Sequence, residues 1–514
     1  MNRLAIAVLL PGLGILTLYA GSQDTVAQQQ ERVEHGLRAN ITIGGKPSGP
    51  ILERMRTLQV PGAGVAVIRN YRVEWAKGYG VRNAATGEPV TDATRFQVAS
   101  ITKPLTAVIA LSLVEQGRLD LDRDVNAYLR SWKVPENVFT KTEKVTIRRL
   151  LSHTAGLTVR GFRGYPAGAP VPTLLQVLDG LPPANSEPIR VDQVPGTGFR
   201  YSGGGFTVLQ QLLEDVTGQS LADLARERVF APLGMTHSSI GVPPHPTTPL
   251  ELSMAHVPNA VPGYRFLSGG SGCCEWWTTP TDLAKFALAI QRSLRGDTAS
   301  VLSQATARMM VTPVAGGPTG LGFFVNDAGD TRYFEHSGGN PGFGSMLVAT
   351  VEGGHGAVIL ENAGNTGGFV GEVLTSIGAV YGLAGPQTVS YQSSADLVAA
   401  YKRAKAIRPD DPMVAEGAVN ALGYRLLRNH MREEAVHVFQ LNTELYPDSA
   451  NAEDSLAEAH ESAGHLEAAL AHYRLAIDKL DRHGPRNAGY ERNRAAAQSK
   501  IADLTARVSK KPGR

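Results

Sequence analysis

Cysteine is almost absent from the sequence, whose 514 residues include only the adjacent pair Cys273 and Cys274. So few thiols exclude a fold built on disulfides, and we expect the pair to be reduced or partly buried rather than joined as a vicinal disulfide. A strong excess of one charge is also missing, because the formal net charge is +3. This balance gives no reason to expect nucleic acid or a charged membrane surface as a partner.

Sites for metal ions and nucleotides are missing as well. The stretch from Asp120 has Val125 and Ser131 where a calcium loop needs glycine and glutamate. His460–His465 has one residue too many for a zinc-binding histidine pair, and Gly44–Gly49 lacks the spacing of a phosphate loop. We therefore expect no metal and no cofactor.

One apolar stretch stands near the N-terminus, from Leu4 to Ala20, after a single arginine. This pattern predicts a secretory signal peptide over residues 1–27. Cleavage after Ala27 and cleavage near Ala20 both fit, and an uncleaved anchor is the alternative because the stretch is close to the length of a membrane span. We expect a periplasmic or secreted protein, attached to a membrane only if the signal is uncleaved.

The following sequence predicts a mixed α/β domain (α+β) over residues 50–385, after a linker over 28–49. Two β-rich runs flank Asn70-Tyr71, as in a hairpin. A helical pattern begins at Ser100 and ends near Gly117, and short β-rich runs return between residues 321 and 360. Strands at both ends of the region, with helices between them, favour one sheet in which early and late strands meet.

The strand signals vanish in the last part of the chain, after a second linker over residues 386–410. Three pairs of similar residues recur there at a spacing of 34: Leu422 and Leu456, Ala435 and Ala469, Phe439 and Tyr473. This period resembles that of tetratricopeptide repeats, which are helix pairs. We expect an all-α domain over 411–514, whose two units lean on the first domain or on a terminal helix around Glu491 to Val508. The repeats would either stabilise the protein or dock a protein partner.

The chemistry begins at Ser100 and Lys103, three residues apart at the start of the first long helix. Residues at this spacing are neighbours on a helix. A serine hydroxyl becomes a good nucleophile when a neighbouring base takes its proton. A lysine can do so only in its neutral form, which burial or nearby cations favour.

Two further motifs carry polar groups next to glycines. Tyr201 lies in the segment FRYSGGGF, just before a second helical pattern. His336 lies in EHSGGNPGF, on a predicted strand whose glycines let a substrate approach the backbone closely. A tyrosine held at a helix entry can share in proton transfer.

The motifs S-x-x-K, Y-S-x and H-S-G, in this order, resemble those of the serine β-lactamase and penicillin-binding protein superfamily. The branch that they most resemble contains class C β-lactamases, family VIII carboxylesterases and related D-alanyl-D-alanine carboxypeptidases. The segments LLSHTAGL, from Leu150, and FAPLGMTHSSI, from Phe230, are also similar to that family. The resemblance covers residues 50–385 and implies an antiparallel sheet flanked by helices.

The resemblance also implies a role for each matching residue. Ser100 would be the acylated nucleophile, Lys103 its general base, and Tyr201 the relay of the proton to the leaving group. The backbone N–H groups of Ser100 and Gly339 would form the oxyanion hole. The substrate site would be lined by the third motif and the end of the second: His336, Ser337, Gly338, Gly339 and Gly203.

Two positions depart from the family's pattern. The second motif ends in Gly203, where the family has an asparagine that contacts the acylamido group of β-lactams and peptides. The third motif begins with His336, where many members have lysine. A histidine is mostly neutral at neutral pH unless an acid such as Glu335 raises its pKa, so a permanent cation for a substrate carboxylate is not assured.

Other residues near the motifs have simpler interpretations. We expect His153, within LLSHTAGL, to be structural. Trp276 and Trp277 either border the cleft or pack in the core, and Thr279-Pro280 predicts a helix start.

The sequence thus predicts an exported serine hydrolase that acts through a Ser100 acyl-enzyme, with esters or small amides as the first choice of substrate. A penicillin-binding D-alanyl-D-alanine carboxypeptidase acting on peptidoglycan-like substrates, or a β-lactamase, is the alternative. An inactive hydrolase fold that binds a partner through its repeats is the rival from another class.

Overall fold

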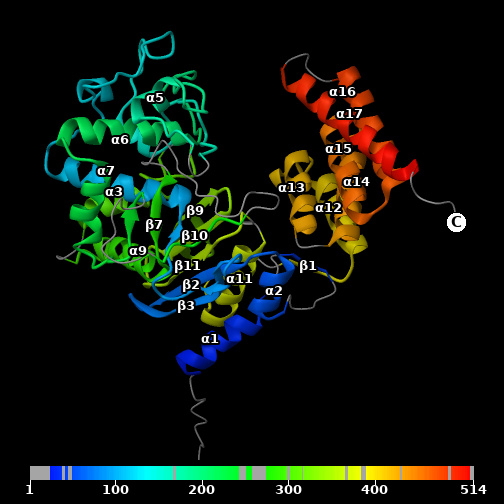
Figure 1. The fold of residues 1–514 in the computed structure, drawn as a ribbon, viewed down its shortest axis with the longest axis horizontal. Helices are drawn as coiled ribbons and strands as arrows, with labels where there is room; N and C mark the ends of the chain where they lie inside the picture. Colours follow the sequence, from blue (N-terminus) through cyan, green and yellow to red (C-terminus); the bar gives the residue numbers. More distant parts are fainter. Residues whose placement is uncertain are drawn as a thin grey trace, which may run out of the picture.

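The computed structural model describes residues 24–37, 41–43, 49–165, 169–241, 251–256, 274–297, 301–314, 317–364, 368–383, 389–428, 431–483 and 488–509. They form an α/β body and an all-helical body (Figure 1). Nearly all of the predicted signal segment lies outside these ranges. None of the helices within them is long and apolar enough to cross a membrane.

A seven-stranded sheet forms the centre of the α/β body, and every pair of neighbouring strands in it is antiparallel. The early strand β2 pairs with the late strand β11, so the two ends of the domain meet as the sequence predicted. Asn70 and Tyr71 both have left-handed φ angles, which suits the tight turn of the predicted β2–β3 hairpin. In spatial order the strands are β4 (Glu88–Pro89), β3 (Arg72–Asn83), β2 (Gly62–Arg69), β11 (Gly356–Glu361), β10 (Phe343–Thr350), β9 (Thr331–Asn340) and β8 (Phe324–Ala328).

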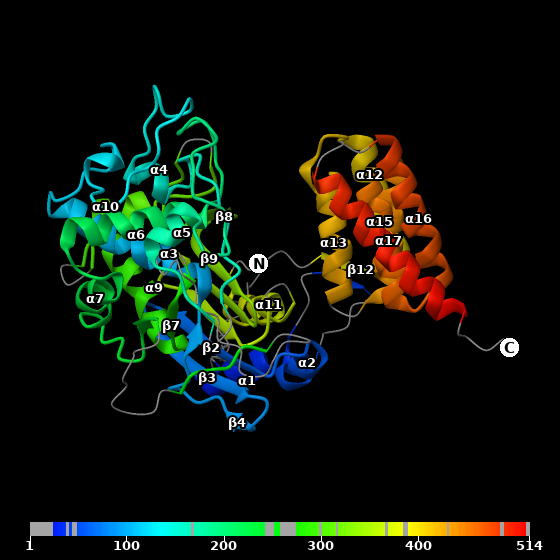
Figure 2. The same ribbon diagram turned by 45° about the horizontal axis from the view of Figure 1, so that its top comes forward.

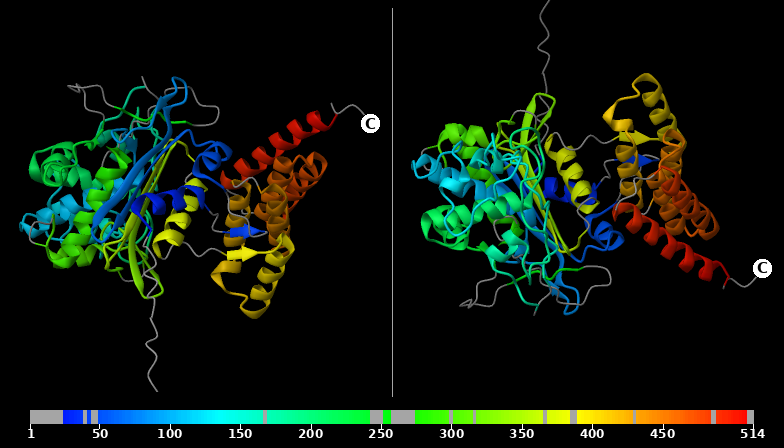
Figure 3. Two further views of the ribbon diagram at one scale, coloured as in Figure 1. Left: turned by 90° about the horizontal axis from the view of Figure 1, so that it is seen from below. Right: turned by 90° about the horizontal axis from the view of Figure 1, so that it is seen from above.

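One face of this sheet is covered by the larger group of helices, shown edge-on in Figure 3. A continuous apolar core lies between them, and α3 contributes an almost wholly buried helix to it. A small sheet of β5 (Phe96–Gln97), β7 (Trp276–Thr278) and β6 (Ser239–Ile240) lies at the edge of this layer. The helices are α3 (Thr102–Glu115), α4 (Ile147–Leu151), α5 (Leu174–Asp179), α6 (Gly203–Thr217), α7 (Leu221–Ala225), α9 (Pro280–Arg295) and α10 (Gln304–Met310).

The opposite face is covered by α1 (Val26–His35), α2 (Ile51–Thr57) and α11 (Phe369–Tyr381). The prediction of a linker over residues 28–49 is wrong for its first part, because Val33 and Leu37 are buried in this second core. The Ser376 hydroxyl also donates a hydrogen bond to the Val33 carbonyl oxygen, at 2.9 Å. The chain before residue 38 is therefore part of the hydrolase-like body.

The all-helical body begins earlier than predicted. Its first helix, α12 (Ser394–Ile407), buries Leu397 in the helical core, so residues 386–410 are not simply a linker. A short parallel pair joins β12 (Val389–Tyr391) to β1 (Ile41–Ile43), so the N-terminal segment contributes a strand beside this body (Figure 2). The other helices are η4 (Pro412–Val414), α13 (Glu416–Arg428), α14 (Arg432–Leu445), α15 (Ala450–Ala463), α16 (Leu466–His483) and α17 (Ala488–Ser509).

The residues of the predicted repeat occupy matching positions in these helices. Leu422 and Leu456 are buried on α13 and α15, and the small residues Ala435 and Ala469 are fully buried on α14 and α16. The helical content and the terminal helix are as predicted. The assignment to the tetratricopeptide class stays a prediction.

The cysteine prediction is wrong. Cys274 is disulfide-bonded, and the chain has one other cysteine, Cys273, which lies outside the described residues.

Candidate active site

Ser100 and Lys103 are brought together at the junction of a strand and a helix. Ser100 is the middle residue of the 3-10 turn η1 (Ala99–Ile101), which runs directly into α3. The Lys103 side-chain nitrogen Nζ lies 2.9 Å from the Ser100 hydroxyl oxygen, within hydrogen-bond distance. Lys103 is only 1% exposed. The pair therefore has the geometry of a nucleophile and its base, in a site that largely excludes water from the base.

Tyr201 lies directly before α6, as the sequence predicted. Ser202 is the N-cap of that helix, and its hydroxyl accepts a hydrogen bond from the Gly205 N–H. The cap fixes the chain direction at Tyr201, whose ring centroid lies 5.0 Å from Lys103 Nζ. The predicted nucleophile, base and tyrosine are thus neighbours in space.

His336 faces the same site from β9, the second strand from one edge of the sheet. Its ring centroid lies 6.3 Å from that of Tyr201 and 5.5 Å from that of Phe324. Burial, and then the nearby charge of Lys103, lower the pKa of His336 to about 3. The imidazole is therefore neutral at physiological pH, and it supplies no cation for a substrate carboxylate.

The neighbouring carboxylate of Glu335 does not make His336 positively charged. As the residue directly before His336 on β9, Glu335 belongs to the opposite face of the sheet, where it lines a cavity with Met346 and Leu374. Burial raises the pKa of its carboxyl, and Asn326 donates a hydrogen bond to it. The expectation that Glu335 could help to charge His336 is wrong.

His153 lies beside the site, and its contacts there fit the structural role expected from the sequence. Its ring centroid lies 4.3 Å from that of Tyr201, and its Nδ1 accepts a hydrogen bond from the Ser202 N–H at 3.1 Å. Burial, followed by the charge of Lys103, holds its pKa well below the usual value. A neutral imidazole thus supports the inner side of Tyr201 and adds no second positive charge beside Lys103.

The glycines of the third motif differ in their surroundings. A Cβ atom at Gly338 would lie 2.1 Å from the Val98 carbonyl oxygen, so only glycine lets β9 pass so close to the start of the nucleophile turn. At Gly339 a Cβ would meet nothing within 4 Å. The space beside Gly339 is therefore open, as an oxyanion-hole residue requires, and Ser337 precedes both glycines on the same strand.

Gly203 has a neighbour where the family's asparagine side chain would begin. A Cβ at Gly203 would lie 3.0 Å from the Arg160 carbonyl oxygen and 3.5 Å from a ring carbon of Phe162. The segment that follows the LLSHTAGL motif thus occupies this part of the site. Where the family has an asparagine side chain, this protein has a glycine with the backbone of Arg160 beside it.

Three residues of this region have left-handed φ angles that side chains other than glycine rarely adopt. They are Ala99, His153 and Val159, and Val159 is β-branched, which makes this conformation especially unfavourable. Such strain concentrates at functional sites, where the surrounding structure holds it in place. The strained backbone at these three residues therefore marks the same region as the side chains of the predicted site.

The tryptophans of the adjacent loop pack in the protein interior. Trp276 is fully buried and its ring lies against those of Phe230 and Phe286, while Trp277 lies against Phe343. Of the two interpretations of this loop, packing is the correct one for both side chains. The helix start predicted at Thr279-Pro280 is also present.

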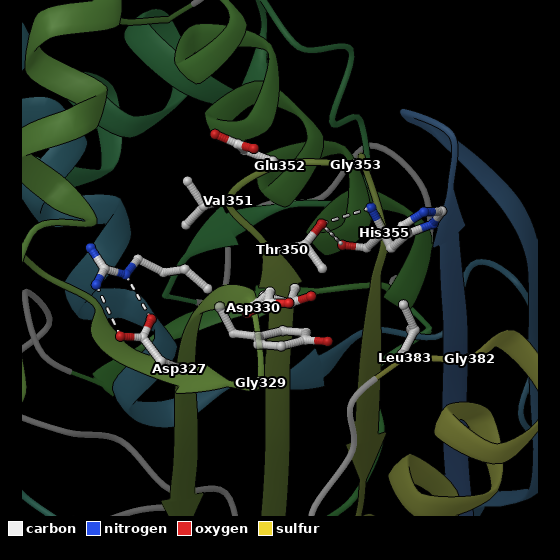
Figure 4. Close-up of a pocket in the computed structure, with 13 residues that line it drawn as sticks. Asp327, Gly329, Asp330, Thr350, Val351, Glu352, Gly353, His355, Gly382 and Leu383 are labelled. Carbon is white, nitrogen blue, oxygen red and sulfur yellow. Dashed lines mark hydrogen bonds and ion pairs between the residues drawn. The ribbon is translucent and has the colours of Figure 1, made fainter.

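A cavity of about 700 Å³ lies elsewhere, at the turns between β8 and β9 and between β10 and β11. Figure 4 shows it with Asp327 bound to Arg332 and Thr350 hydrogen-bonded to the backbone of His355. Its lining contains neither Ser100 nor a residue of the three motifs. The cavity is therefore separate from the predicted site at Ser100. Within the described ranges, no cluster of side chains is suited to hold a metal ion.

With this geometry in place, comparison with known proteins identifies the family. The β-lactamase family model matches residues 51–380. The chain belongs to the β-lactamase family. Members of this family are serine hydrolases, and this β-lactamase-family protein is one of them.

Among its relatives, penicillin-binding protein 4 of Amycolatopsis lactamdurans is 30% identical over 323 residues, which are 59% of this chain and 81% of the relative. Protein flp of Staphylococcus aureus (strain N315) is 25% identical over 332 residues, and this chain spans only 60% of its length.

Solved structures share the fold of this β-lactamase-family protein. The octameric penicillin-binding protein homologue from Pyrococcus abyssi superposes with a TM-score of 0.53 at 24% identity, over 66% of this chain and 77% of that one. The D-amino acid amidase from Ochrobactrum anthropi gives a TM-score of 0.53 at 22% identity, over 69% of this chain and 99% of that one.

Proposed function

We propose that this protein hydrolyses esters or small amides through an acyl-enzyme on Ser100. The observation that carries the proposal is the 2.9 Å distance between the Ser100 hydroxyl oxygen and Nζ of the buried Lys103. A half-buried serine at hydrogen-bond distance from a buried lysine is an arrangement suited to nucleophilic catalysis by serine.

Acylation begins when the neutral Lys103 amine takes the hydroxyl proton and the Ser100 oxygen attacks the carbonyl carbon. The carbonyl π bond opens and its oxygen carries the negative charge, which the backbone N–H groups of Ser100 and Gly339 stabilise. When the intermediate collapses, the bond to the leaving group breaks. The proton passes from Lys103 through Tyr201 to the leaving oxygen or nitrogen.

Deacylation repeats these steps with water in place of Ser100. The base removes a proton from water, the hydroxide oxygen attacks the ester carbon of the acyl-enzyme, and Ser100 leaves with a proton returned through the same path. The acid product and the free enzyme result. Since Lys103 and Tyr201 act in both halves, each is expected to contribute about 10²–10⁴-fold to the rate.

Two features favour esters and small amides over β-lactams and peptides. Gly203 offers no side-chain amide to an acylamido group, and the Arg160 carbonyl oxygen occupies the space beside it. His336 is neutral and so lacks the charge that a lysine would offer there. Losing one such hydrogen bond weakens recognition by about 1–3 kcal/mol.

A penicillin-binding D-alanyl-D-alanine carboxypeptidase is the second candidate. The relative that supports it is penicillin-binding protein 4, at 30% identity. The rival from another class, an inert fold that binds a partner through the helical body, conflicts with the preserved Ser100, Lys103 and Tyr201 set.

Export through a signal peptide is also part of the proposal. The apolar stretch from Leu4 to Ala20 supports it. Cleavage near Ala20 would leave α1 whole, whereas cleavage after Ala27 would remove Thr25, the N-cap of that helix. We therefore favour the earlier position, which N-terminal sequencing of the exported protein would test.

The substrate test compares kcat/KM for a 4-nitrophenyl alkanoate, an N-acyl-D-alanyl-D-alanine peptide and benzylpenicillin, each with the wild type and with Ser100→Ala. The proposal expects the ester to be the best substrate and every rate to require Ser100. A peptide preferred over the ester would favour the carboxypeptidase, and an active Ser100→Ala variant would contradict the mechanism.

A further inference from the structure

The segment from Thr158 to Phe162 is tied to the start of α6 by backbone hydrogen bonds. The Gly203 N–H donates to the Arg160 carbonyl oxygen and the Gly204 N–H to that of Val159, each at 3.0 Å. The Ser202 hydroxyl donates to the Thr158 carbonyl oxygen at 2.7 Å. These bonds satisfy N–H groups that a helix start leaves without partners. Arg160 is therefore held in a fixed place beside the second motif.

This segment replaces the missing side chain of the second motif. Gly203 stands where the family has an asparagine that faces the acyl half of the substrate. The position at which that side chain would begin is only 3.0 Å from the Arg160 carbonyl oxygen. The acyl side of the site is thus bordered by Arg160 instead of by an amide.

The Arg160 side chain extends over the catalytic tyrosine. Its guanidinium carbon lies 5.7 Å from the centroid of the Tyr201 ring, which is itself 5.0 Å from Lys103 Nζ. Arg160 is exposed, so its charge is at the mouth of the site and reachable from solution.

No Asp or Glu carboxylate neutralises this guanidinium. Every Asp and Glu of the chain lies in the described ranges, and none of them forms an ion pair with Arg160. Neighbouring arginines do have such partners: Arg149 pairs with Glu143, Arg190 with Asp179 and Arg200 with Asp192. An arginine that is fixed by its backbone, and whose fork of donors meets no carboxylate of the described residues, is suited to bind an anion.

We propose that Arg160 recognises an anionic group, a carboxylate in the simplest case, on the acyl half of the substrate. The substrates would be half-esters or half-amides of dicarboxylic acids, or acyl groups with a comparable terminal charge. This inference rests on the proposed Ser100 mechanism and adds a substrate class to it. His336 cannot supply the charge because it is neutral, and Lys103 is engaged with the nucleophile.

The test uses three esters and the full-length protein. Mono-4-nitrophenyl adipate and 4-nitrophenyl hexanoate have acyl chains of equal length and differ in the terminal carboxylate, and 4-carboxyphenyl hexanoate moves the charge to the leaving group. The kcat and KM of each are measured for the wild type, Arg160→Gln, Arg160→Lys and the control Arg163→Gln, which removes an exposed arginine directly after this segment.

We expect Arg160→Gln to lower the adipate-to-hexanoate ratio of kcat/KM by about five- to tenfold, mainly through KM, because the ion pair is exposed to solvent. Arg160→Lys should restore part of the ratio, and added salt should reduce the wild-type ratio. Arg163→Gln should leave it unchanged. The inference is overturned if Arg160→Gln leaves the ratio as in the wild type, or if it affects 4-carboxyphenyl hexanoate instead.

The failure of the proposed function is a separate outcome. Hydrolysis that persists in Ser100→Ala contradicts the mechanism, whatever the ratio shows. If the wild type turns over none of the esters, the inference is judged by NMR titration of adipamic acid against hexanamide. An Arg160-dependent preference for the acid then supports it, and its absence overturns it.

Discussion

His336 donates its Nδ1 hydrogen to the carbonyl oxygen of Ser337, the next residue along β9, at 2.7 Å. A carbonyl oxygen can only accept, so Nδ1 must carry the hydrogen and Nε2 of the neutral ring must lack one. Nε2 is buried, and no hydrogen-bond partner for it exists in the described part of the chain. The ring therefore faces the site as an acceptor and not as a cation.

The pH dependence of stability follows from this environment. In the unfolded chain a histidine titrates at about pH 6.5. In the folded protein burial lowers the pKa of His336 to about 3 and also lowers that of His153. Below pH ~6.5 the unfolded state thus binds more protons, and the free energy of unfolding should fall by up to ~1.4 kcal/mol per pH unit for each histidine.

Denaturant unfolding between about pH 7.5 and pH 4.5 measures this slope. Tryptophan fluorescence reports the α/β body alone, because the four tryptophans are Trp75, Trp132, Trp276 and Trp277. His336→Asn should show a shallower loss of stability than the wild type. Parallel curves for the two proteins would show that His336 is not held neutral by the fold.

Lys103 and Tyr201 should behave as one proton path. Lys103→Ala and Tyr201→Phe should each lower kcat/KM for an ester by about 10²–10⁴-fold. The double variant should lose little more than the worse single variant, because residues that act together do not contribute additively. Two losses that multiply in the double variant would indicate separate roles.

Replacing Gly203 should disturb the α6 entry. A side chain there would press on the Arg160 carbonyl oxygen, which lies 3.0 Å from the new Cβ, so Gly203→Asn should lower stability by about 1–3 kcal/mol. The variant should also fail to improve penicillin recognition, because Arg160 and Phe162 border the position of the new side chain. Gly198→Asn is the control, because a Cβ at Gly198 meets nothing within 4 Å. Equal thermal unfolding of the two variants would contradict this packing.

Removing the helical body should spare catalysis. A cut near residue 388 takes away β12, the partner of β1, and leaves Ile43 without the helical core on which it packs. Stability should fall, while kcat/KM stays within about threefold, a change in barrier of well under ~1 kcal/mol. Thermal unfolding, light scattering and ester kinetics test this. A folded truncation that binds substrate without turning it over would mean that the helical body completes the site.

The parts of the fold that local patterns determine were predictable. The Asn70-Tyr71 turn, the helix after Ser100 and the spacing of 34 residues all depend on neighbours in sequence. The start of α1 shows a missed signal, because Thr25 and Gln28 form a capping box, the pattern that marks the beginning of a helix. The segment was nevertheless interpreted as a linker.

The site was predictable only where a motif marked it. Ser100, Lys103, Tyr201 and His336 meet as the motifs implied. His153 and Arg160 acquire their places through packing on Tyr201, which no spacing in the sequence reveals. The neutrality of His336 likewise comes from burial in the folded chain.

The most direct test of the central claim is mass spectrometry of the intact protein after exposure to an activated ester, a penicillin and a fluorophosphonate. The account predicts a mass increase of one acyl or phosphonyl group, mapped by peptide analysis to Ser100 and absent from Ser100→Ala. Labelling of another serine, or labelling that persists in Ser100→Ala, would contradict it.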